Sequence, residues 1–208
     1  MKVSIKGLQV AINTVADKGE VRFYLCGVFM KESEIAATNG HILSVYNQKN
    51  METESWNGLE IIIPTDNISN FLKRVSKHAT EYAMAELAKA DGDFWTISFK
   101  YLDKKSRDVE TIVELFKPID AKYPDYKRML IADNQAQKPQ GTMCFNSYYL
   151  TTLNKIAKVA KVAKTNNGGL LGVQLDFYGH NSPVKVSFVD PRITVILMPM
   201  RGITPKVD

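Results

Sequence analysis

Residues that could perform catalysis are few and scattered in this sequence. The candidate metal ligands and nucleophiles are three histidines and two cysteines: His41, His78, His180, Cys26 and Cys144. None of them has the spacing of a metal site, and the sequence contains neither a nucleophile motif nor a glycine-rich phosphate loop. We therefore expect a protein that is not an enzyme and that binds neither a metal nor another cofactor.

Basic residues, by contrast, gather on two segments with a helical pattern. The chain carries a net charge of +5, which modestly favours an anionic partner. These basic residues are Lys73, Arg74, Lys77 and His78 in 65–79, and Lys155, Lys158, Lys161 and Lys164 in 147–164. At helical spacing, the first three lysines of 147–164 cover an arc of roughly 120°. Because no aromatic residues alternate with them, they suit the phosphates of duplex DNA better than a single strand, although a solvated helix face gives the same pattern.

The elements that must position these residues follow one order three times, namely strand, helix and further strands. The first unit has strands at 3–5, 21–30, 33–37 and 42–46, with a helix that ends before Gly19. The second has strands at 59–63, 94–101 and 109–115, with a helix that begins at Thr65 or Asp66. The third has strands at 142–145, 172–178, 184–189 and 193–198, with a helix at 147–164. The segment 79–90 fits either helix or strand, and the pattern leaves both open.

A unit of this kind shows one apolar face and needs a neighbour to bury it. With 208 residues, 45% of them hydrophobic, the chain can build a substantial core. The pattern therefore predicts an α+β fold. We expect two half-units at 1–58 and 59–131, a polar linker at 132–141 and a third unit at 142–208.

Three regions carry a family resemblance when they are taken together and in order. The first joins Tyr24–Val28 with Ala37–Leu43, the second is Tyr123–Arg128 and the third is Ile196–Arg201. In this order they resemble the middle and C-terminal parts of the bacterial DNA polymerase III β sliding clamp. The resemblance implies the DNA-clamp fold, in which helices lie on one side of antiparallel sheets. Residues 1–131 resemble the complete central domain and 142–201 the second half of the last domain, whereas the family's first domain and the first half of its third have no counterpart.

The resemblance also implies a pocket that receives the clamp-binding peptide of polymerases and buries its leucine and aromatic side chains. Its floor and walls would be Leu25, Thr38, Gly40, His41, Ile42, Leu43, Pro124, Met129, Val184, Ile196 and Leu197. Its lip would be Met198, Pro199 and Met200, with further peptide contacts from Arg128, Asn146 and Tyr149. Methionines can repack around different ligands, and the arginine could pair with acidic groups of the peptide.

Two positions depart from the family pattern. Ile42 stands where the family usually has arginine, and Asn39 where it usually has aspartate. The first change makes the pocket less basic, so the preferred peptide can differ. Taken singly, each of the three regions also fits an ordinary turn or strand end.

Three functions remain open at this level. The first is a processivity clamp, of a phage or mobile element, that oligomerises around duplex DNA and tethers a polymerase. Since three half-domain units are an odd number, two C-terminal units could pair in a two-fold dimer, and two dimers could form a tetramer. The second is a clamp-like adaptor or decoy that binds the peptides without forming a ring. The third is an unrelated α+β binding domain.

Location is predicted from what the sequence lacks. No apolar run approaches the roughly 18–20 residues that span a bilayer, and the N-terminus does not have the pattern of a signal peptide. Two cysteines within apolar segments are too few for a disulfide framework. We expect a cytoplasmic protein with no membrane association.

Overall fold

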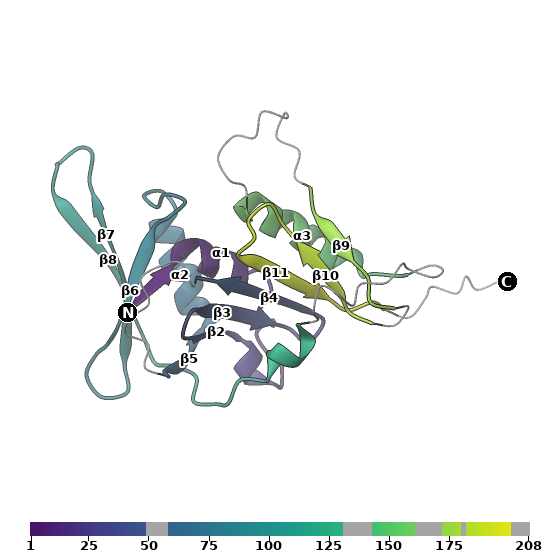
Figure 1. The fold of residues 1–208 in the computed structure, drawn as a ribbon. Helices are drawn as coiled ribbons and strands as arrows, with labels where there is room; N and C mark the ends of the chain where they lie inside the picture. The colour runs from purple at the N-terminus through teal and green to yellow at the C-terminus, as the bar shows by residue number, and fades with distance from the viewer. Residues whose placement is uncertain (49–57, 131–142, 161–171, 180–181, 201–208) are drawn as a thin grey trace.

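Two antiparallel sheets and three α-helices make up the described part of the chain (Figure 1). The computed structural model describes residues 1–48, 58–130, 143–160, 172–179 and 182–200. The first unit contains β1 (Lys2–Ser4), α1 (Ile5–Ala11), the 3₁₀ turn η1 (Phe23–Leu25), β2 (Gly27–Lys31), β3 (Glu34–Thr38) and β4 (Ile42–Asn47). The second contains β5 (Glu60–Pro64), α2 (Thr65–Val75), β6 (Met84–Lys89), β7 (Trp95–Leu102) and β8 (Val109–Phe116), followed by the 3₁₀ turn η2 (Tyr126–Met129). The third contains α3 (Ser147–Ala160), β9 (Gln174–Asp176), β10 (Val184–Ser187) and β11 (Ile193–Leu197).

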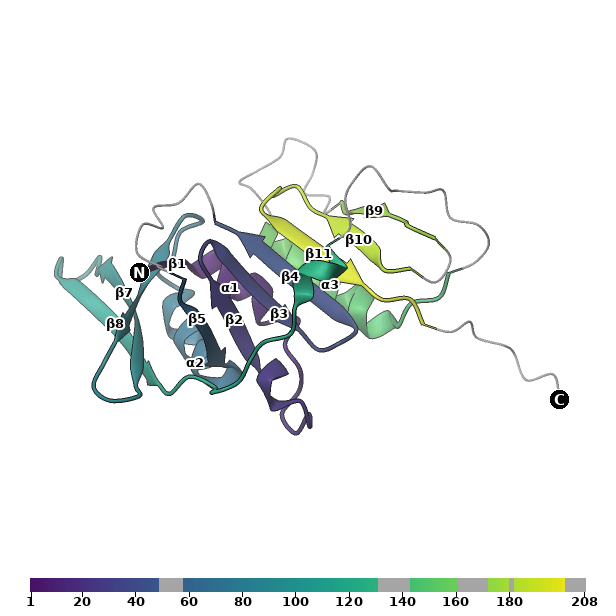
Figure 2. The same ribbon diagram turned by 60° about the horizontal axis from the view of Figure 1, so that its bottom comes forward.

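The first two units exchange their first strands. The sheet with the order β1-β6-β7-β8 takes β1 from the first unit, and the sheet with the order β5-β2-β3-β4-β11-β10-β9 takes β5 from the second. The third unit joins the larger sheet through its last strand, because β11 runs antiparallel to β4 with Ile196 opposite Leu43. The three helices lie behind the seven-stranded sheet in Figure 2. The predicted α+β architecture, with helices on one side of antiparallel sheets, is therefore confirmed.

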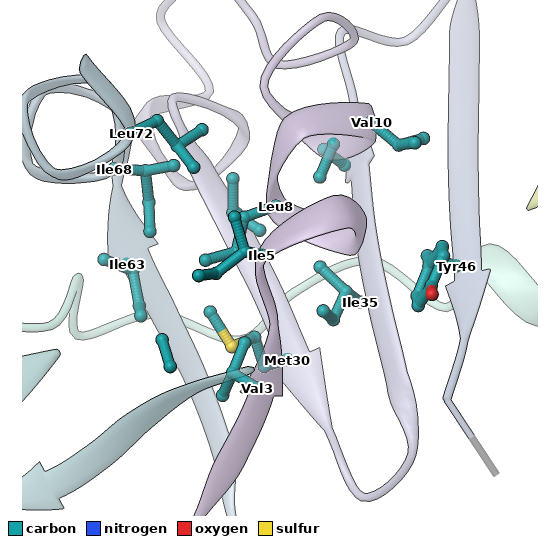
Figure 3. Close-up of a cluster of buried hydrophobic side chains, with 14 of the residues drawn as sticks. Val3, Ile5, Leu8, Val10, Met30, Ile35, Tyr46, Ile63, Ile68 and Leu72 are labelled. Atoms are coloured by element: carbon teal, nitrogen blue, oxygen red, sulfur yellow. The ribbon is translucent and has the colours of Figure 1, made fainter. Parts of the chain in front are cut away.

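The helices cover an inner apolar core. Ser4 caps α1, since its hydroxyl accepts a hydrogen bond from the Gly7 amide at 3.2 Å. A Cβ atom at Gly7 would lie 2.6 Å from Cδ1 of Ile35 and 2.7 Å from the Tyr46 ring, so the glycine lets α1 approach the sheet closely. The side chains of Ile5, Leu8 and neighbouring strand residues interdigitate in this layer (Figure 3).

The opposite face of the seven-stranded sheet is also covered. Residues 117–130, here called the strap, cross this outer face and contain η2 (Figure 2). The Tyr123 ring of the strap stacks on Phe29 of β2, with centroids 4.6 Å apart. Its hydroxyl accepts a hydrogen bond from the Thr38 amide at 3.1 Å. The middle strands are consequently buried on both faces, and β2 and β4 lack the polar alternation of a half-exposed strand.

A buried cluster of charged side chains, here called the ion cluster, connects the turn before β11 to α1. The Lys6 ammonium lies 2.8 Å from Asp190 and 3.2 Å from Glu81, although its side chain is only 4% exposed. Arg192 donates two hydrogen bonds to the Asp190 carboxylate, at 2.9 and 2.7 Å. The cluster therefore links the first unit to the third by charge as well as by strand pairing.

Several predicted boundaries were wrong. The strand expected at 21–30 begins only at Gly27, because Phe23–Leu25 form the 3₁₀ turn η1. The helix expected before Gly19 ends at Ala11. The ambiguous segment 79–90 contains β6, and the strand expected at 142–145 is reduced, within the described residues, to one bridge between Cys144 and Met200. The linker expected at 132–141 lies outside the described residues.

Candidate functional site

A cavity of about 330 Å³ lies on the outer face, where the first unit, the strap and the third unit meet. It collects residues from all three regions that carried the family resemblance. Its lining comprises Arg22, Tyr24, Leu25, Thr38, Gly40, His41, Ile42, Leu43, Pro124, Asp125, Tyr126, Met129, Ile196 and Met198. The volume is at the lower end of the roughly 300–1,000 Å³ that is usual for ligand pockets.

The turn between β3 and β4 forms one wall, and its shape follows from its sequence. The Asn39 side-chain oxygen accepts hydrogen bonds from the amides of His41 and Ile42, at 3.0 and 3.1 Å. Gly40 has φ +91°, a conformation that other residues seldom adopt. Because an aspartate oxygen could accept the same two bonds, the asparagine preserves the turn while removing a charge.

The second wall is the strap, which hydrogen bonds hold against the sheet. The Tyr126 hydroxyl donates to Glu34 at 2.6 Å, and burial together with this carboxylate raises the pKa of Tyr126 well above its usual range. Burial likewise raises the pKa of Tyr123. Both tyrosines are therefore neutral and hold the strap against the sheet, and Tyr126 also lines the cavity.

The third wall comes from the end of β11. Ile196 lies opposite Leu43 in the sheet, and both belong to the apolar cluster under the strap. The amide of Met198 donates to the carbonyl of His41 at 2.9 Å, which closes the cavity against the β3–β4 turn. The floor of the cavity is thus built on the junction between the first and third units.

The polar groups of the rim are held in fixed positions. Arg22 donates two hydrogen bonds to Glu20, at 3.0 and 3.1 Å. Hydrogen bonds from the Arg22 side chain and amide lower the pKa of Glu20 to about 2, so the pair stays ionised over a wide pH range. A Cβ atom at Gly40 would lie 2.9 Å from Nη1 of Arg22, which places the guanidinium directly beside the turn. The rim can meet a polar or charged group of a ligand, while the floor is apolar.

Ten of the residues expected in the pocket line this cavity: Leu25, Thr38, Gly40, His41, Ile42, Leu43, Pro124, Met129, Ile196 and Met198. Two expected wall residues, Val184 and Leu197, face the other way. They lie opposite each other in the sheet and are at most 1% exposed, and Leu197 belongs to the inner core. Successive residues of a strand point to opposite faces, so Ile196 and Leu197 cannot both line one cavity.

The remaining expected contacts lie around the cavity rather than in its lining. Tyr149 packs its ring against His41, with centroids 6.0 Å apart. Asn146 caps α3, since its side-chain oxygen accepts from the Tyr148 amide at 2.9 Å. Arg128 has a side chain that is 84% exposed and forms an ion pair with Asp125 at 2.8 Å. At the lip, Pro199 and Met200 follow Met198 but are not part of the lining.

Four lining residues were not among the predicted contacts: Arg22, Tyr24, Asp125 and Tyr126. Three of them belong to the segments that carried the resemblance, so their inclusion needed only the fold. Arg22 had no such signal. It precedes η1 and reaches the β3–β4 turn with its side chain, where Nη2 donates to the carbonyl of Asn39 at 3.5 Å.

The expected DNA-contacting residues divide into two groups. Lys73 on α2, Lys77 in the turn after α2, and Lys155 and Lys158 on α3 are exposed. Arg74 instead forms an ion pair with Glu114 and donates to the carbonyl of Asn70, so its charge is partly neutralised. Lys161 lies outside the described residues.

A second cavity, of about 490 Å³, lies beside β5 and the end of the strap. Its lining includes charges of both signs, among them an exposed Lys117–Asp93 pair at 2.9 Å. Such a solvated ion pair gives little selectivity. None of the regions singled out in the sequence converges there.

Neither a metal centre nor a membrane span occurs in the part of the chain that the structure describes. No cluster of three or more histidine, cysteine, aspartate or glutamate residues is placed to hold a metal ion there. None of the helices described combines the length and apolarity that crossing a membrane requires.

The fold of the chain is that of bacterial sliding clamps of known structure. The structure of the DNA polymerase sliding clamp from Pseudomonas aeruginosa superimposes with a TM-score of 0.68 and 15% identity, over 97% of this chain and 66% of that one. The clamp from Caulobacter crescentus gives 0.66 and 17%, over 97% and 65%. The DNA polymerase III beta subunit from Thermotoga maritima gives 0.61 and 16%, over 98% and 65%.

The similarity is structural and partial. No family model matches the sequence, and no curated protein does. The chain spans 65–66% of the length of these three clamps. The resemblance seen in the sequence is therefore confirmed for the fold and for its truncation relative to a complete clamp.

Proposed function

We propose that this protein is a sliding-clamp-like binding protein whose junction cavity receives the clamp-binding peptide of a polymerase. The observation that carries the proposal is that three remote segments wall one cavity at the β4–β11 junction. Its apolar floor, which includes Leu25 and Ile196, suits leucine and aromatic side chains of an extended peptide. Met198 at the lip can repack around different anchors.

We further propose that the helix layer contacts duplex DNA without sequence specificity and that the protein serves as a replication processivity factor in the cytoplasm. The structurally similar proteins are named as DNA polymerase sliding clamps. The exposed lysines of α2 and α3 suit phosphates, and contacts of this kind position a protein without reading bases. Arg74 contributes less, because Glu114 already pairs with it.

A second candidate is a clamp-like adaptor or decoy that binds the peptides but encloses no DNA. It is supported by the cavity itself, because residues of a single chain form its walls without a second copy. The two candidates share the cavity and differ in assembly.

The cavity is tested with a fluorescent peptide that carries leucine and phenylalanine anchors. Met198→Ala removes a lining side chain, and we expect a roughly tenfold or greater loss of affinity, in the range of an interface hot spot. Met200→Ala is the matched control, because Met200 is 47% exposed and lies outside the lining. Equal affinities of the two variants would place the peptide elsewhere and refute the site.

The two candidates are separated by retention on DNA. A processivity clamp should remain on nicked circular DNA and slide off after linearisation. Replacing Lys73 and Lys155 by glutamine should reduce the salt dependence of any DNA contact. An adaptor should retain the peptide affinity and show no difference between circular and linear DNA.

A further inference from the structure

The outer edge of β8 has no strand partner among the described residues. β8 lies at the end of the smaller sheet, and it pairs with β7 over eight consecutive residues without a bulge. Natural edge strands are usually protected by shortness, bulges, proline or lysine. Residues 109–116, Val-Glu-Thr-Ile-Val-Glu-Leu-Phe, have none of these protections. The β7–β8 hairpin stands at the margin of the molecule in Figure 1.

One face of this edge strand is apolar and exposed. Val109, Val113 and Leu115 alternate along β8 and are 69%, 47% and 55% exposed. Leu102 of β7 lies opposite Val109 and is 63% exposed, which extends the row. A contiguous apolar row on an open edge is typical of an interaction surface.

The acidic residues of β8 do not protect the edge, because they lie on its other face and are engaged within the chain. Glu110 accepts a hydrogen bond from the Tyr101 hydroxyl at 2.5 Å. Glu114 pairs with Arg74 and accepts a hydrogen bond from Asn67 at 3.0 Å. The outer backbone edge of β8, which pairs with no described strand, and the apolar row beside it can therefore receive another strand.

The strand pairing between the other two units indicates which strand could pair with the open edge of β8. The first and third units join through their last strands, β4 and β11, which run antiparallel. β8 is the last strand of the second unit, and among the described residues it is the only one of these three strands that pairs with a neighbour on one edge alone. The matching strand in the same kind of junction is therefore β8 of a second copy.

We propose that two copies associate through β8, antiparallel about a two-fold axis, so that their smaller sheets form one eight-stranded sheet. In an antiparallel pair, residues that lie opposite each other point to the same face of the sheet. The two-fold axis must therefore pass midway between the two copies of one residue. An axis at Ile112 would place Glu110 opposite Glu114 twice, which is unfavourable. An axis at Val113 places the two Val113 side chains together, Thr111 opposite Leu115, and each glutamate opposite an apolar residue. The second register is the one we infer.

This association has a consequence for the helix layer. A two-fold axis perpendicular to the sheet keeps the same face of both copies on the same side, so the two α2 helices with their lysines lie on one continuous surface. The inference rests on β8 alone, and it stands or fails independently of the peptide site.

The register is tested by cysteine cross-linking in a background of Cys26→Ser and Cys144→Ser. The Val113→Cys thiols would meet at the axis, within the Cα separation of about 4.4–6.8 Å that a disulfide requires. The Thr111→Cys thiols would be four residues apart along the strands, roughly 13 Å, and serve as the matched control. We expect mild oxidation to give a covalent dimer with Val113→Cys and a severalfold lower yield with Thr111→Cys. Equal yields, or no dimer with Val113→Cys, would overturn the proposal.

The association itself is tested by light scattering of the full chain over a range of micromolar concentrations. We expect a dimer for the natural sequence and a monomer for Val113→Lys, which brings two ammonium groups together at the axis. Val21→Lys is the control for added charge, because Val21 is 92% exposed and remote from β8. A natural chain that stays monomeric, or a dimer that survives Val113→Lys, would contradict the interface.

Discussion

The buried ion cluster predicts that one carboxylate stabilises the attachment of the third unit. Asp190 is 1% exposed and bridges Lys6 of α1 and Arg192 at the start of β11. Burial opposes ionisation of Asp190, but hydrogen bonds from Arg192 and Lys6 outweigh it and lower its pKa to about 2, from 3.8. The native state therefore favours the ionised form more than the unfolded chain does.

The expected loss on Asp190→Ala follows from two estimates. A depression of nearly two pKa units corresponds to about 2–3 kcal/mol of stability at neutral pH. Removing one partner of a buried ion pair costs about 3–5 kcal/mol, because the remaining charge is left buried. Lys6 keeps Glu81 at 3.2 Å and is not left without a partner, so the two estimates together give an expected loss of about 2–4 kcal/mol.

Urea denaturation followed by far-UV circular dichroism measures this loss. The folded pKa is below the unfolded value, so this contribution is complete above pH of about 4 and disappears as the pH falls towards 2. The stability difference between the natural chain and Asp190→Ala should therefore shrink over that interval. Asp93→Ala, which breaks the exposed pair with Lys117, is the control and should leave stability unchanged. A loss below about 1 kcal/mol for Asp190→Ala, or a difference that does not vary with pH, would refute the reasoning.

Further predictions concern the turn, the helix approach and the strap. Gly40→Ala should destabilise the protein by about 1–3 kcal/mol in urea, because φ is +91° there; an unchanged midpoint would contradict the turn geometry. Gly7→Ala should cost about 1–3 kcal/mol, because a Cβ atom would lie 2.6 Å from a core side chain. Gly172→Ala is the control, because its added Cβ would have no atom within 4 Å, and equal losses for the two variants would contradict the crowding at Gly7. In an alkaline absorbance titration, Tyr123 and Tyr126 should remain protonated after the exposed tyrosines have ionised, until the protein unfolds; early ionisation of all tyrosines would show that the strap does not bury them.

Periodicity predicted the existence of most elements but not their ends. The helical pattern before Gly19 continues beyond Ala11, where the structure has turns, because Val15 still packs on the core outside the helix. The spacing of apolar residues therefore predicted correctly which residues are buried, but it did not predict their backbone conformation. The same limit applies to 21–30, where η1 interrupts a run rich in strand-forming residues.

The pocket was predictable at the level of segments and only partly at the level of side chains. The order of the three regions predicted that Leu43, Pro124 and Met198 would share one cavity, and they do. The direction of neighbouring side chains could not be read from Ile193–Leu197, because this strand is apolar on both faces. Pairing with β4 decides that Ile196 faces the cavity and Leu197 the inner core.

The amino-acid sequence by itself determined the repeated strand–helix–strand order and the three segments that form the cavity walls, because periodicity and turn residues act over short distances. Only the tertiary structure decided that β1 and β5 exchange between units, that the strap buries the outer face, and that no other described strand pairs with the outer edge of β8. These features depend on pairings between strands far apart in the chain, and a strand's own sequence does not specify which partner it meets.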